Sequence, residues 1–379
     1  MANIVSRERR LQMLAALVDG NSECAVARMI DINARTISRF ALALGRGAER
    51  LHDRLVRDLS PHLIEIDEIW SYVGKKQARV MANDPPWVGE AYTFVGIDAT
   101  SRLCIAYQVG KRDQSTTDAF IADLRARLRV MPQLMTSDGF VPYIAAIETS
   151  FGPACTYAQV VKNYRCGGLR DDDHRYEPPR DPFLTKRAIY GTPDLERAAT
   201  SHVERNNGTM RHHIGRIRRL CYAFSKRIEN HRAAVALGYA WYNFGTIVKT
   251  LRVTPAMAAG ITDHVWELGE FMDTVLAEPD GERPQPKPLR HELPTGPARE
   301  LPNGRGFLRL LPGGQSTSST GPPTATTSSV VPPLAPRQSS SETAAPPPTI
   351  PTAPPEPPKP PEPIQLSLFD ILQLPDGGT

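Results

Sequence analysis

The sequence is poor in cysteine, and its five cysteines form no CxxC pair. Their odd number and scattered positions exclude a dense disulfide scaffold and a cysteine zinc module, and they favour reduced thiols in a cytosolic protein. Long apolar runs are also missing: no stretch of 18 apolar residues occurs, and the first residues, MANIVSRERRLQM, contain no apolar signal core. We therefore expect a protein that is neither secreted nor inserted into a membrane.

Aromatic residues are nearly absent from one long segment. Residues 284–363 contain 23 of the 36 prolines but a single aromatic residue, Phe307. Such a composition cannot bury enough apolar surface to offset the loss of chain entropy on folding. The sequence therefore predicts that the folded part ends near residue 275 and that residues 276–363 form a disordered Pro-rich linker.

Positive charge is unevenly distributed. The whole chain has a formal net charge of +4, yet residues 201–232 alone contain eight Lys or Arg against two Glu. A local excess of this kind indicates a polyanionic partner.

Residues 1–58 are predicted to form a helical DNA-binding domain. The segments 7–20, 22–30 and 34–45 have helical apolar spacing, with Ser22 as an N-cap and Gly20 and Gly45 as stops. Two short helices joined by the turn 31–33 form a helix-turn-helix pattern with Ala25 and Ile37 facing inward. Its exposed, DNA-facing residues would be Arg35, Thr36, Ser38 and Arg39, although an ordinary helical hairpin shows the same pattern.

The pattern of predicted strands and helices from 59 to 275 is typical of an α/β domain. Strands are predicted at 62–73, 91–99, 102–110, 132–140 and 154–161, and helices at 115–128, 141–151, 200–217 and 227–244, with a polar insertion at about 165–199. This order describes a mixed sheet with flanking helices, the ribonuclease H-like arrangement, in which the first strand and the later parallel strand are neighbours. Six aromatic residues are expected in the core: Trp70, Tyr222, Phe224, Trp241, Tyr242 and Phe244.

Three carboxylates would meet in such a fold. Asp67 lies in the first strand, Asp138 follows the later parallel strand, and Glu204 lies on the helix at 200–217. Together they would hold Mg²⁺, which prefers oxygen ligands, and two such ions support in-line phosphoryl displacement. Mn²⁺ is expected to substitute.

Each of these residues also has an ordinary structural interpretation. Asp138 before Gly139 is a common turn signal, and Glu204 among arginines fits an exposed helix face. Glu65 and Glu68 compete with Asp67, and we assign both to supporting roles. The run DDDH at 171–174 is interpreted as a solvated charge run.

Longer segments carry a resemblance to a known family. EIDEIWSYVGKK, MTSDGF, SHVERNNGTMRHHIGRIRRLCYAFSKRIENH and LRVTPAMAAGITDHVWEL together resemble the DDE transposases of bacterial insertion sequences, of the insertion-sequence-one type. The resemblance covers about residues 1–270. Departures are the missing cysteine zinc module and a longer insertion after residue 164, and both concern end recognition and target choice.

The resemblance implies a function and a set of residues. Asp67, Asp138 and Glu204 would be the metal-binding triad of an enzyme that cuts DNA at the element's ends and transfers the freed 3′-OH to target DNA. Its partner would be double-stranded DNA, both the element's ends and the target, on which it would act as a homo-oligomer in the bacterial cytoplasm, associated with the nucleoid. The last catalytic helix would contact DNA through Arg205, Asn206, Asn207, Arg211, His212 and Arg216. Of the two adjacent histidines, only His212 would share the face of Glu204.

The far end of the chain contains one apolar peptide. Gln365, Leu366, Leu368 and Phe369 stand in the segment 364–374 after the Pro-rich linker, and they resemble the peptide with which bacterial proteins bind the β sliding clamp. The alternatives are a sticky chain end and a segment that folds back on the catalytic domain.

Two other functions remain open from the sequence. The chain could be a DNA-binding regulator or a decayed transposase copy without catalysis, or a nuclease limited to the hydrolytic step. Strand-joined products would distinguish a transposase from the nuclease.

Overall fold

The computed structural model describes residues 5–152, 155–163, 183–219, 221–280 and 287–290. Contacts divide the chain into two units, and all of these residues belong to the first, Met1–Pro297. The helical segment predicted as a separate domain, residues 1–58, thus packs in the same compact unit as the sheet. The predicted Pro-rich linker from residue 291 and the peptide 364–374 lie outside the described residues.

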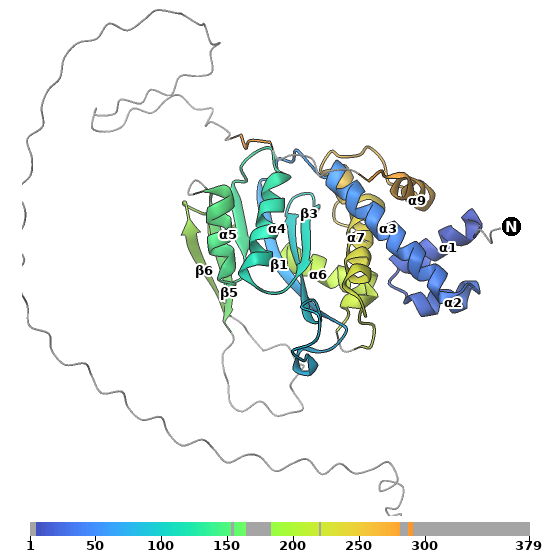
Figure 1. Ribbon diagram of the computed structural model, residues 1–379. Helices are drawn as coiled ribbons and strands as arrows, with labels where there is room; N and C mark the ends of the chain where they lie inside the picture. The colour runs from blue at the N-terminus through green and yellow to red at the C-terminus, as the bar shows by residue number, and fades with distance from the viewer. Residues whose placement is uncertain (1–4, 153–154, 164–182, 220, 281–286, 291–379) are drawn as a thin grey trace, which may run out of the picture. The chain divides into compact units, whose positions relative to one another are not determined.

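A mixed sheet organises this unit (Figure 1). The described strands form one six-stranded sheet in the order β3-β2-β1-β4-β5-β6. Their bounds are β1 Leu63–Val73, β2 Gly89–Asp98, β3 Cys104–Gly110, β4 Leu134–Ser137, β5 Tyr157–Asn163 and β6 Phe183–Tyr190. β1 pairs antiparallel with β2 and parallel with β4, with Ile66 opposite Ser137. The expected adjacency of the first strand and the later parallel strand is confirmed.

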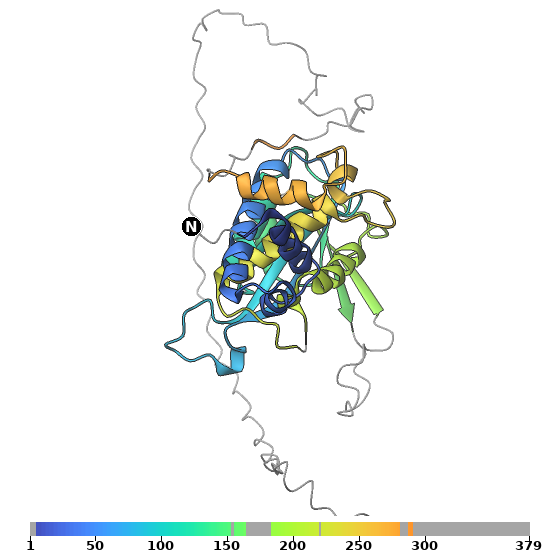
Figure 2. The same ribbon diagram turned by 90° about the vertical axis from the view of Figure 1, so that its right-hand side faces the viewer.

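Helices cover both faces of the sheet (Figures 1 and 2). Apolar residues of α4 (Gln114–Ala126) and α5 (Pro142–Phe151) pack with Ile64, Ile66 and Phe94 on one face. α6 (Ser201–His213) and α7 (Ile228–Gly245) pack with Ile69, Val73 and Val95 on the other. Alternation along β1 explains the split, because successive side chains of a strand point to opposite faces. The last two described helices are the short α8 (Pro255–Ala258) and α9 (Leu268–Ala277).

The third helix is longer than predicted. α1 (Arg7–Val18) and α2 (Glu23–Ile30) are short, but α3 (Ala34–Leu55) continues through Gly45 to Leu55. A Cβ on Gly45 would lie 2.4 Å from the backbone of Ala233 in α7, and one on Gly47 would lie 2.0 Å from the carbonyl oxygen of Val275 in α9. These glycines allow close helix packing and do not end the helix, so the predicted stop at Gly45 is wrong.

The predicted insertion contains a sixth strand. β6 pairs antiparallel with β5 along its full length and extends the sheet. Its sequence, FLTKRAIY, has two adjacent basic residues and a mixed pattern of burial, so it carries no clear alternation. Pairing with the edge of β5 supplies its hydrogen bonds, which a local pattern does not reveal.

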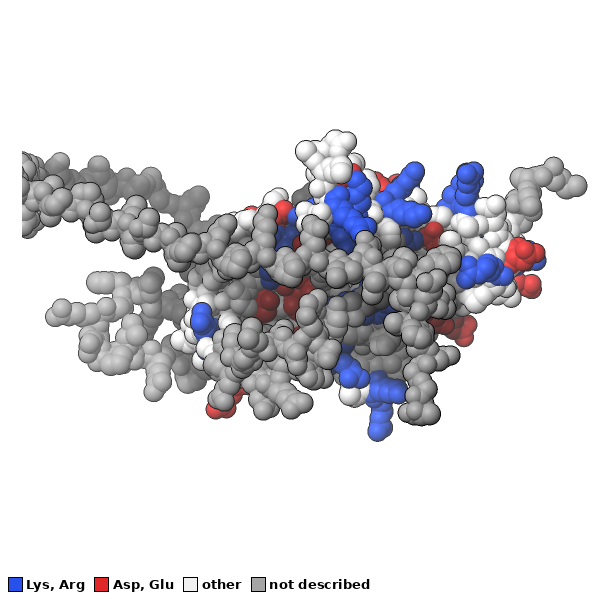
Figure 3. Space-filling model, turned by 90° about the horizontal axis from the view of Figure 1, so that it is seen from below, with Lys and Arg blue, Asp and Glu red and all other residues white. Residues whose placement is uncertain are grey.

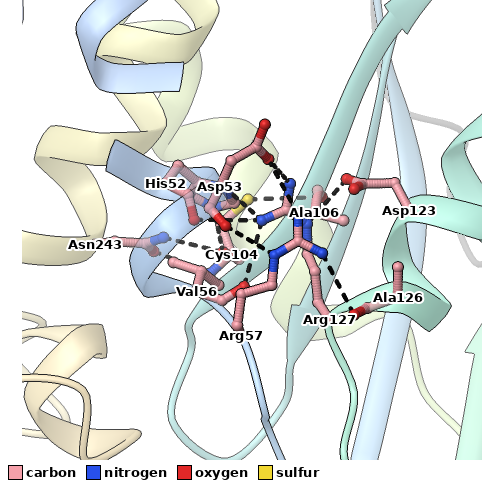
Figure 4. A network of polar contacts seen from close by, with 10 residues as sticks. All are labelled: His52, Asp53, Val56, Arg57, Cys104, Ala106, Asp123, Ala126, Arg127 and Asn243. Carbon is pink, nitrogen blue, oxygen red and sulfur yellow. Dashed lines mark hydrogen bonds and ion pairs between the residues drawn. The ribbon is translucent and has the colours of Figure 1, made fainter. Parts of the chain in front are cut away.

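A buried arginine joins the N-terminal helices to the sheet domain (Figure 4). The Arg127 guanidinium, after α4, forms ion pairs with Asp53 of α3 and with Asp123, at 2.9 Å in the second case. It also donates to Nδ1 of His52 at 3.1 Å, so the other ring nitrogen of His52 donates to the Cys104 carbonyl. Strands and helices that are far apart in the sequence are thereby held by one network.

Two smaller predictions are corrected. The helix predicted from residue 115 begins at Gln114, because the Asp113 carboxylate caps α4 by accepting from the Thr116 amide at 2.8 Å. Tyr222, predicted in the core, is 95% exposed, because it lies in the irregular segment between α6 and α7 and not on a helix. Among the described helices, none combines the length and apolar content needed to cross a membrane.

Candidate active site

The predicted carboxylates line one pocket at the edge where β1 and β4 meet. Its wall includes Asp67, Glu68, Asp138 and Glu204. Asp138 directly follows β4, whose last residue, Ser137, stands opposite Ile66. Because the strands are parallel and adjacent, the next position on each brings Asp67 and Asp138 together. An Asx turn holds Asp138, whose Oδ1 accepts from the Phe140 amide at 3.0 Å.

Glu68 joins this group, although the sequence assigned it only a supporting role. Ligand oxygens of Asp67, Glu68 and Asp138 all lie within 4.8 Å of one another. Side chains on opposite faces of β1 can both reach Asp138 because β4 ends there and leaves the edge open. Arg112, after β3, donates to Glu68 Oε1 at 3.1 Å and lies 3.8 Å from Asp138 Oδ2.

Glu204 approaches from α6 and has partners of its own. The Thr200 hydroxyl donates to its Oε1 at 2.6 Å, and the Lys162 ammonium at the end of β5 forms an ion pair with it. Its side chain is 37% exposed, so it faces the open side of the pocket. Glu204 therefore lines the same pocket, but it is not one of the three carboxylates within 4.8 Å of each other.

Glu65 explains how α6 is placed against the sheet. Its fully buried carboxylate accepts from the amides of His202 at 2.7 Å and Val203 at 2.9 Å, in the first turn of α6. The His202 ring adds a contact of 2.6 Å through Nδ1. A carboxylate at a helix start satisfies unpaired amides and complements the helix dipole. Glu65 thus fixes the turn that carries Glu204, which agrees with a supporting role.

The electrostatics of the pocket favour added positive charge. Burial, together with the charges of Asp138 and Glu204, raises the pKa of Asp67 to about 6, against hydrogen bonds from the Glu68 backbone and from Asn207. Burial raises the pKa of Glu68 to about 8, with Asp138 and Asp67 adding to the rise and Arg112 opposing it. A bound cation would lower both values, because it stabilises the charged carboxylates.

The donor set fits a hard divalent cation. Carboxylate oxygens at this spacing are the ligands that Mg²⁺ prefers. Asn207 of α6 is 2% exposed and donates to Asp67 Oδ2 at 2.8 Å, while its own Oδ1 is buried with no partner among the described residues. The Oδ1 atom of Asn207 could accept a hydrogen bond from a water molecule bound to such an ion.

Basic side chains ring the acidic group. Arg112, Lys162, Arg211 and Arg219 line the pocket. Burial lowers the pKa of Arg211, and the charge of Arg219 lowers it further. In the view from below, Lys and Arg side chains project at several places on this face, and Asp and Glu side chains also show there (Figure 3). Nothing in the local sequence marked Arg112, which follows Lys111 just after β3, or Lys162 near the end of β5.

The predicted DNA contacts are divided between several places. Asn207 and Arg211 lie in the pocket, while Arg205 and His212 are exposed on α6. Asn206 is buried beside Tyr242 of α7. Arg216 bonds to Glu23 of α2 and to the Ser225 hydroxyl at 3.3 Å, so it joins the helical segment to the sheet domain.

The predicted recognition helix is present as a helix after a tight turn. Asp31, between α2 and α3, has a φ of 51°, and Asn33 caps α3. Ile37 is buried as expected, Arg35 and Arg39 are exposed, and Thr36 is half-buried. The Ser38 hydroxyl accepts from the Asn230 amide at 3.2 Å. Residues 171–174 and the four residues of the predicted clamp peptide lie outside the described residues.

Comparisons with known proteins give a distant likeness. No protein-family model matches the sequence, and no curated protein is significantly similar to it. The structure is similar to a piggyBac transposase synaptic complex with hairpin DNA, at 12% identity and a TM-score of 0.31 over 57% of this chain and 52% of that one. It is also similar to a Mos1 transposase paired-end complex, at 14% identity and 0.17 over 39% of this chain and 58% of that one.

The chain thus spans about half of the piggyBac chain and less than two thirds of the Mos1 chain. Both are transposases by name. At these TM-scores the likeness does not decide what this chain does, which has to be argued from its own residues.

Proposed function

We propose that this chain is a transposase that cuts DNA at the ends of a bacterial insertion sequence and joins the freed 3′-OH to target DNA. The observation that carries the proposal is the pocket of Asp67, Asp138 and Glu204, joined by Glu68 and ringed by Arg and Lys side chains. The long motifs of the sequence support the insertion-sequence-one type, and the strand order supports the ribonuclease H-like fold.

The acidic group would hold divalent cations, Mg²⁺ or Mn²⁺. Asp67, Glu68 and Asp138 supply oxygen ligands at one end of the pocket, and Glu204 faces its open side. When bound, such ions activate an attacking oxygen and stabilise the leaving oxygen of a phosphodiester.

The remaining side chains position the DNA and the carboxylates. Arg112, Lys162, Arg211 and Arg219 provide cationic groups for phosphate oxygens around the acidic centre. Asn207 holds one oxygen of Asp67, so that carboxylate keeps its orientation when the strand arrives. Glu65 keeps α6 on the sheet and thereby sets the distance from Glu204 to the rest of the site.

DNA binding would extend beyond the pocket. Arg35 and Arg39 at the start of α3 and Arg205 and His212 on α6 are exposed and form no ion pair with other described residues. Helix-turn-helix proteins place such residues in the major groove. We propose that α3 recognises the element's ends, that a homo-oligomer holds two ends, and that residues 364–374 dock on the sliding clamp.

The decisive experiment compares wild type with Asp67→Asn, Asp138→Asn and Glu204→Gln on labelled DNA that carries the ends of the gene's own element. In Mg²⁺, wild type should produce nicks with 3′-OH ends and strand-joined products. In each variant the rate of cleavage and joining should fall more than about a thousandfold, because phosphoryl transfer depends on the metal ligands. The affinity for DNA should be retained.

Other outcomes separate the alternatives. Nicks without joined products would indicate a nuclease. Binding without cleavage by wild type, in Mg²⁺ and in Mn²⁺, would indicate a regulator or a decayed copy. A variant that still cleaves at the wild-type rate would remove its residue from the catalytic group.

A further inference from the structure

A row of partly exposed aromatic rings runs away from the carboxylate pocket. Along β1, Glu68, Trp70 and Tyr72 share one face of the strand, and Tyr92 of β2 stands opposite Trp70. The row, here called the aromatic strip, consists of Phe140, Tyr92, Trp70, Tyr72, Phe224 and Tyr222. The first five are half-buried and the last is 95% exposed.

The strip is continuous with the pocket at its inner end. Phe140 and Arg112 both line the pocket. The Arg112 guanidinium lies 3.9 Å from the centroid of the Phe140 ring and 5.9 Å from that of Tyr92. The same arginine donates to Glu68. A flat cation with its face on aromatic rings thus connects the acidic centre to the strip.

The outer part of the strip is built from packed rings. The centroids of Trp70 and Tyr72 are 5.9 Å apart, and Tyr72 stacks on Phe224 at 4.8 Å with an interplanar angle of 24°. The Trp70 indole donates to Glu90 at 3.3 Å, which fixes its orientation. Val73 forms a β-bridge with Ser225, so the segment that carries Phe224 and Tyr222 is held beside the end of β1.

The exposure of the strip has a topological cause. β1 has 11 residues and β4 only 4, and β4 pairs with β1 from Leu63 to Ile66 alone. The packing of α4 and α5 on this face reaches Phe94, which contacts Phe120 and Tyr143 and stands opposite Glu68. Trp70 and Tyr72 lie farther along β1 and keep part of their ring surface in solvent.

We infer that the aromatic strip binds unpaired bases of the DNA strand whose phosphate lies at the carboxylates. Aromatic rings next to cations are how proteins hold single strands, since every base offers a π-face and every nucleotide a charged phosphate. Cations flank both ends: Arg112 and Arg219 line the pocket, and Lys226 and Arg227 are exposed beside the bridge at Ser225. This charge pattern fits a nucleic-acid strand better than an apolar protein surface.

The inference rests on the proposed function, because it needs DNA at the pocket. It adds that DNA near the cut is opened, and that bases released from pairing are held on the strip. Tyr222 is the outermost ring, and its exposure leaves it free to stack on a base without any rearrangement of the core.

The test measures DNA affinity of the full chain by fluorescence anisotropy in an Asp138→Asn background, so that no substrate is cut. The probes are a blunt duplex and the same duplex with a short single-stranded extension. We expect the extended duplex to bind at least about fivefold more tightly, since stacking of one base contributes a factor of about 5 to 150. Tyr222→Ala should remove most of this preference and Tyr222→Phe should retain it.

Controls separate stacking from other effects. Ile247→Ala changes another exposed apolar side chain, 53% exposed, away from the strip, and should leave both affinities unchanged. Trp70→Ala should also reduce the preference for the extended duplex. If Trp70→Ala does not fold, the Tyr222 variants still test the inference, because Tyr222 is 95% exposed and its loss does not disturb the core.

Four results would overturn the inference. Equal affinity of the starting protein for both probes would do so while leaving the proposed function intact. An equal loss for both probes in Tyr222→Ala would assign the ring to general DNA binding, and a loss of self-association with the preference unchanged would assign it to contact between copies. Binding to neither probe would overturn the proposed function, and this inference with it.

Discussion

Glu68 is the residue whose role changes most between sequence and structure. Taken alone it is one of three acids within the strand LIEIDEIW, and nothing in the spacing separates a metal ligand from a supporting carboxylate. The structure brings its carboxylate, whose side chain is 4% exposed, to Asp67 and Asp138. Glu65, three residues earlier, is bound instead to the amides of α6.

We predict that Glu68→Gln raises the Mg²⁺ concentration needed for half-maximal cleavage by about 10–100-fold. Glutamine keeps the size of the side chain and an acceptor for Arg112 but removes one negative charge from the group. A titration of cleavage rate against Mg²⁺ checks this, with Glu270→Gln, exposed on α9, as the matched control. An unchanged Mg²⁺ dependence would return Glu68 to a structural role.

His231 of α7 couples stability to pH. It lies fully buried between the hydroxyls of Ser71, at 3.2 Å, and Ser225, at 2.9 Å. Burial lowers its pKa to about 4, and the charges of Arg216 and Arg232 add to the shift. Between pH 6.5 and about 4 the unfolded chain therefore binds a proton at this residue that the folded chain does not.

The free energy of unfolding should accordingly fall as the pH is lowered through this range, by about 3 kcal/mol from His231 alone. Other groups titrate as well, so the measurement is a difference. Denaturant melts of wild type and His231→Asn from pH 7 to pH 4 should converge as the pH falls. Parallel curves would show that His231 does not titrate between the two states.

At the scale of elements, packing decided where helices end. Gly45 is a helix stop by its residue type, and it would have been one in an isolated helix. In the protein, α7 and α9 approach α3 so closely that only glycine fits at Gly45 and Gly47. The strand β6 is the converse case: its sequence has no clear alternation, and it becomes a strand because β5 offers an edge.

Gly47→Ala should destabilise the protein by more than about 2 kcal/mol, against the usual gain of about 1 kcal/mol for this change in a helix. A Cβ there would lie 2.0 Å from the Val275 carbonyl oxygen, so α3 and α9 would have to move apart. Gly208→Ala in α6, where a Cβ meets nothing within 4 Å, is the control and should stabilise. Denaturant melts of both variants measure the change in the free energy of unfolding relative to wild type, which should be negative for Gly47→Ala and positive for Gly208→Ala. Equal changes in the two variants would contradict the packing argument.

Over the whole described unit, the Arg127 network joins the helical segment to the sheet domain. Asp53 belongs to α3 and Asp123 to α4, and both carboxylates form ion pairs with one guanidinium that is 3% exposed. Asp53 also lies 3.8 Å from the Arg57 guanidinium. Removing a buried partner leaves the two carboxylates with less compensation for their charge, and this costs more than the pair contributes.

Arg127→Met should lower the free energy of unfolding by about 3–5 kcal/mol and keep a single transition. Arg129→Met is the control: its ion pair with Asp58, at 3.9 Å, is partly exposed, and its loss should cost less than about 1 kcal/mol. Calorimetry distinguishes the results. Two separate transitions in Arg127→Met would show that the helical segment and the sheet domain fold independently once the network is gone.

The sequence by itself determined the order of most strands and helices, because alternation, helical spacing and caps are local and are written in neighbouring residues. It also determined the identity of the acidic residues and the adjacency of Asp67 and Asp138, which follows once two strands are parallel and adjacent. Tertiary structure alone decided the course of α3, the sixth strand, the place of Glu68 and the exposed strip from Phe140 to Tyr222. Each of these depends on which distant segment lies alongside, and that is set by packing over the whole chain.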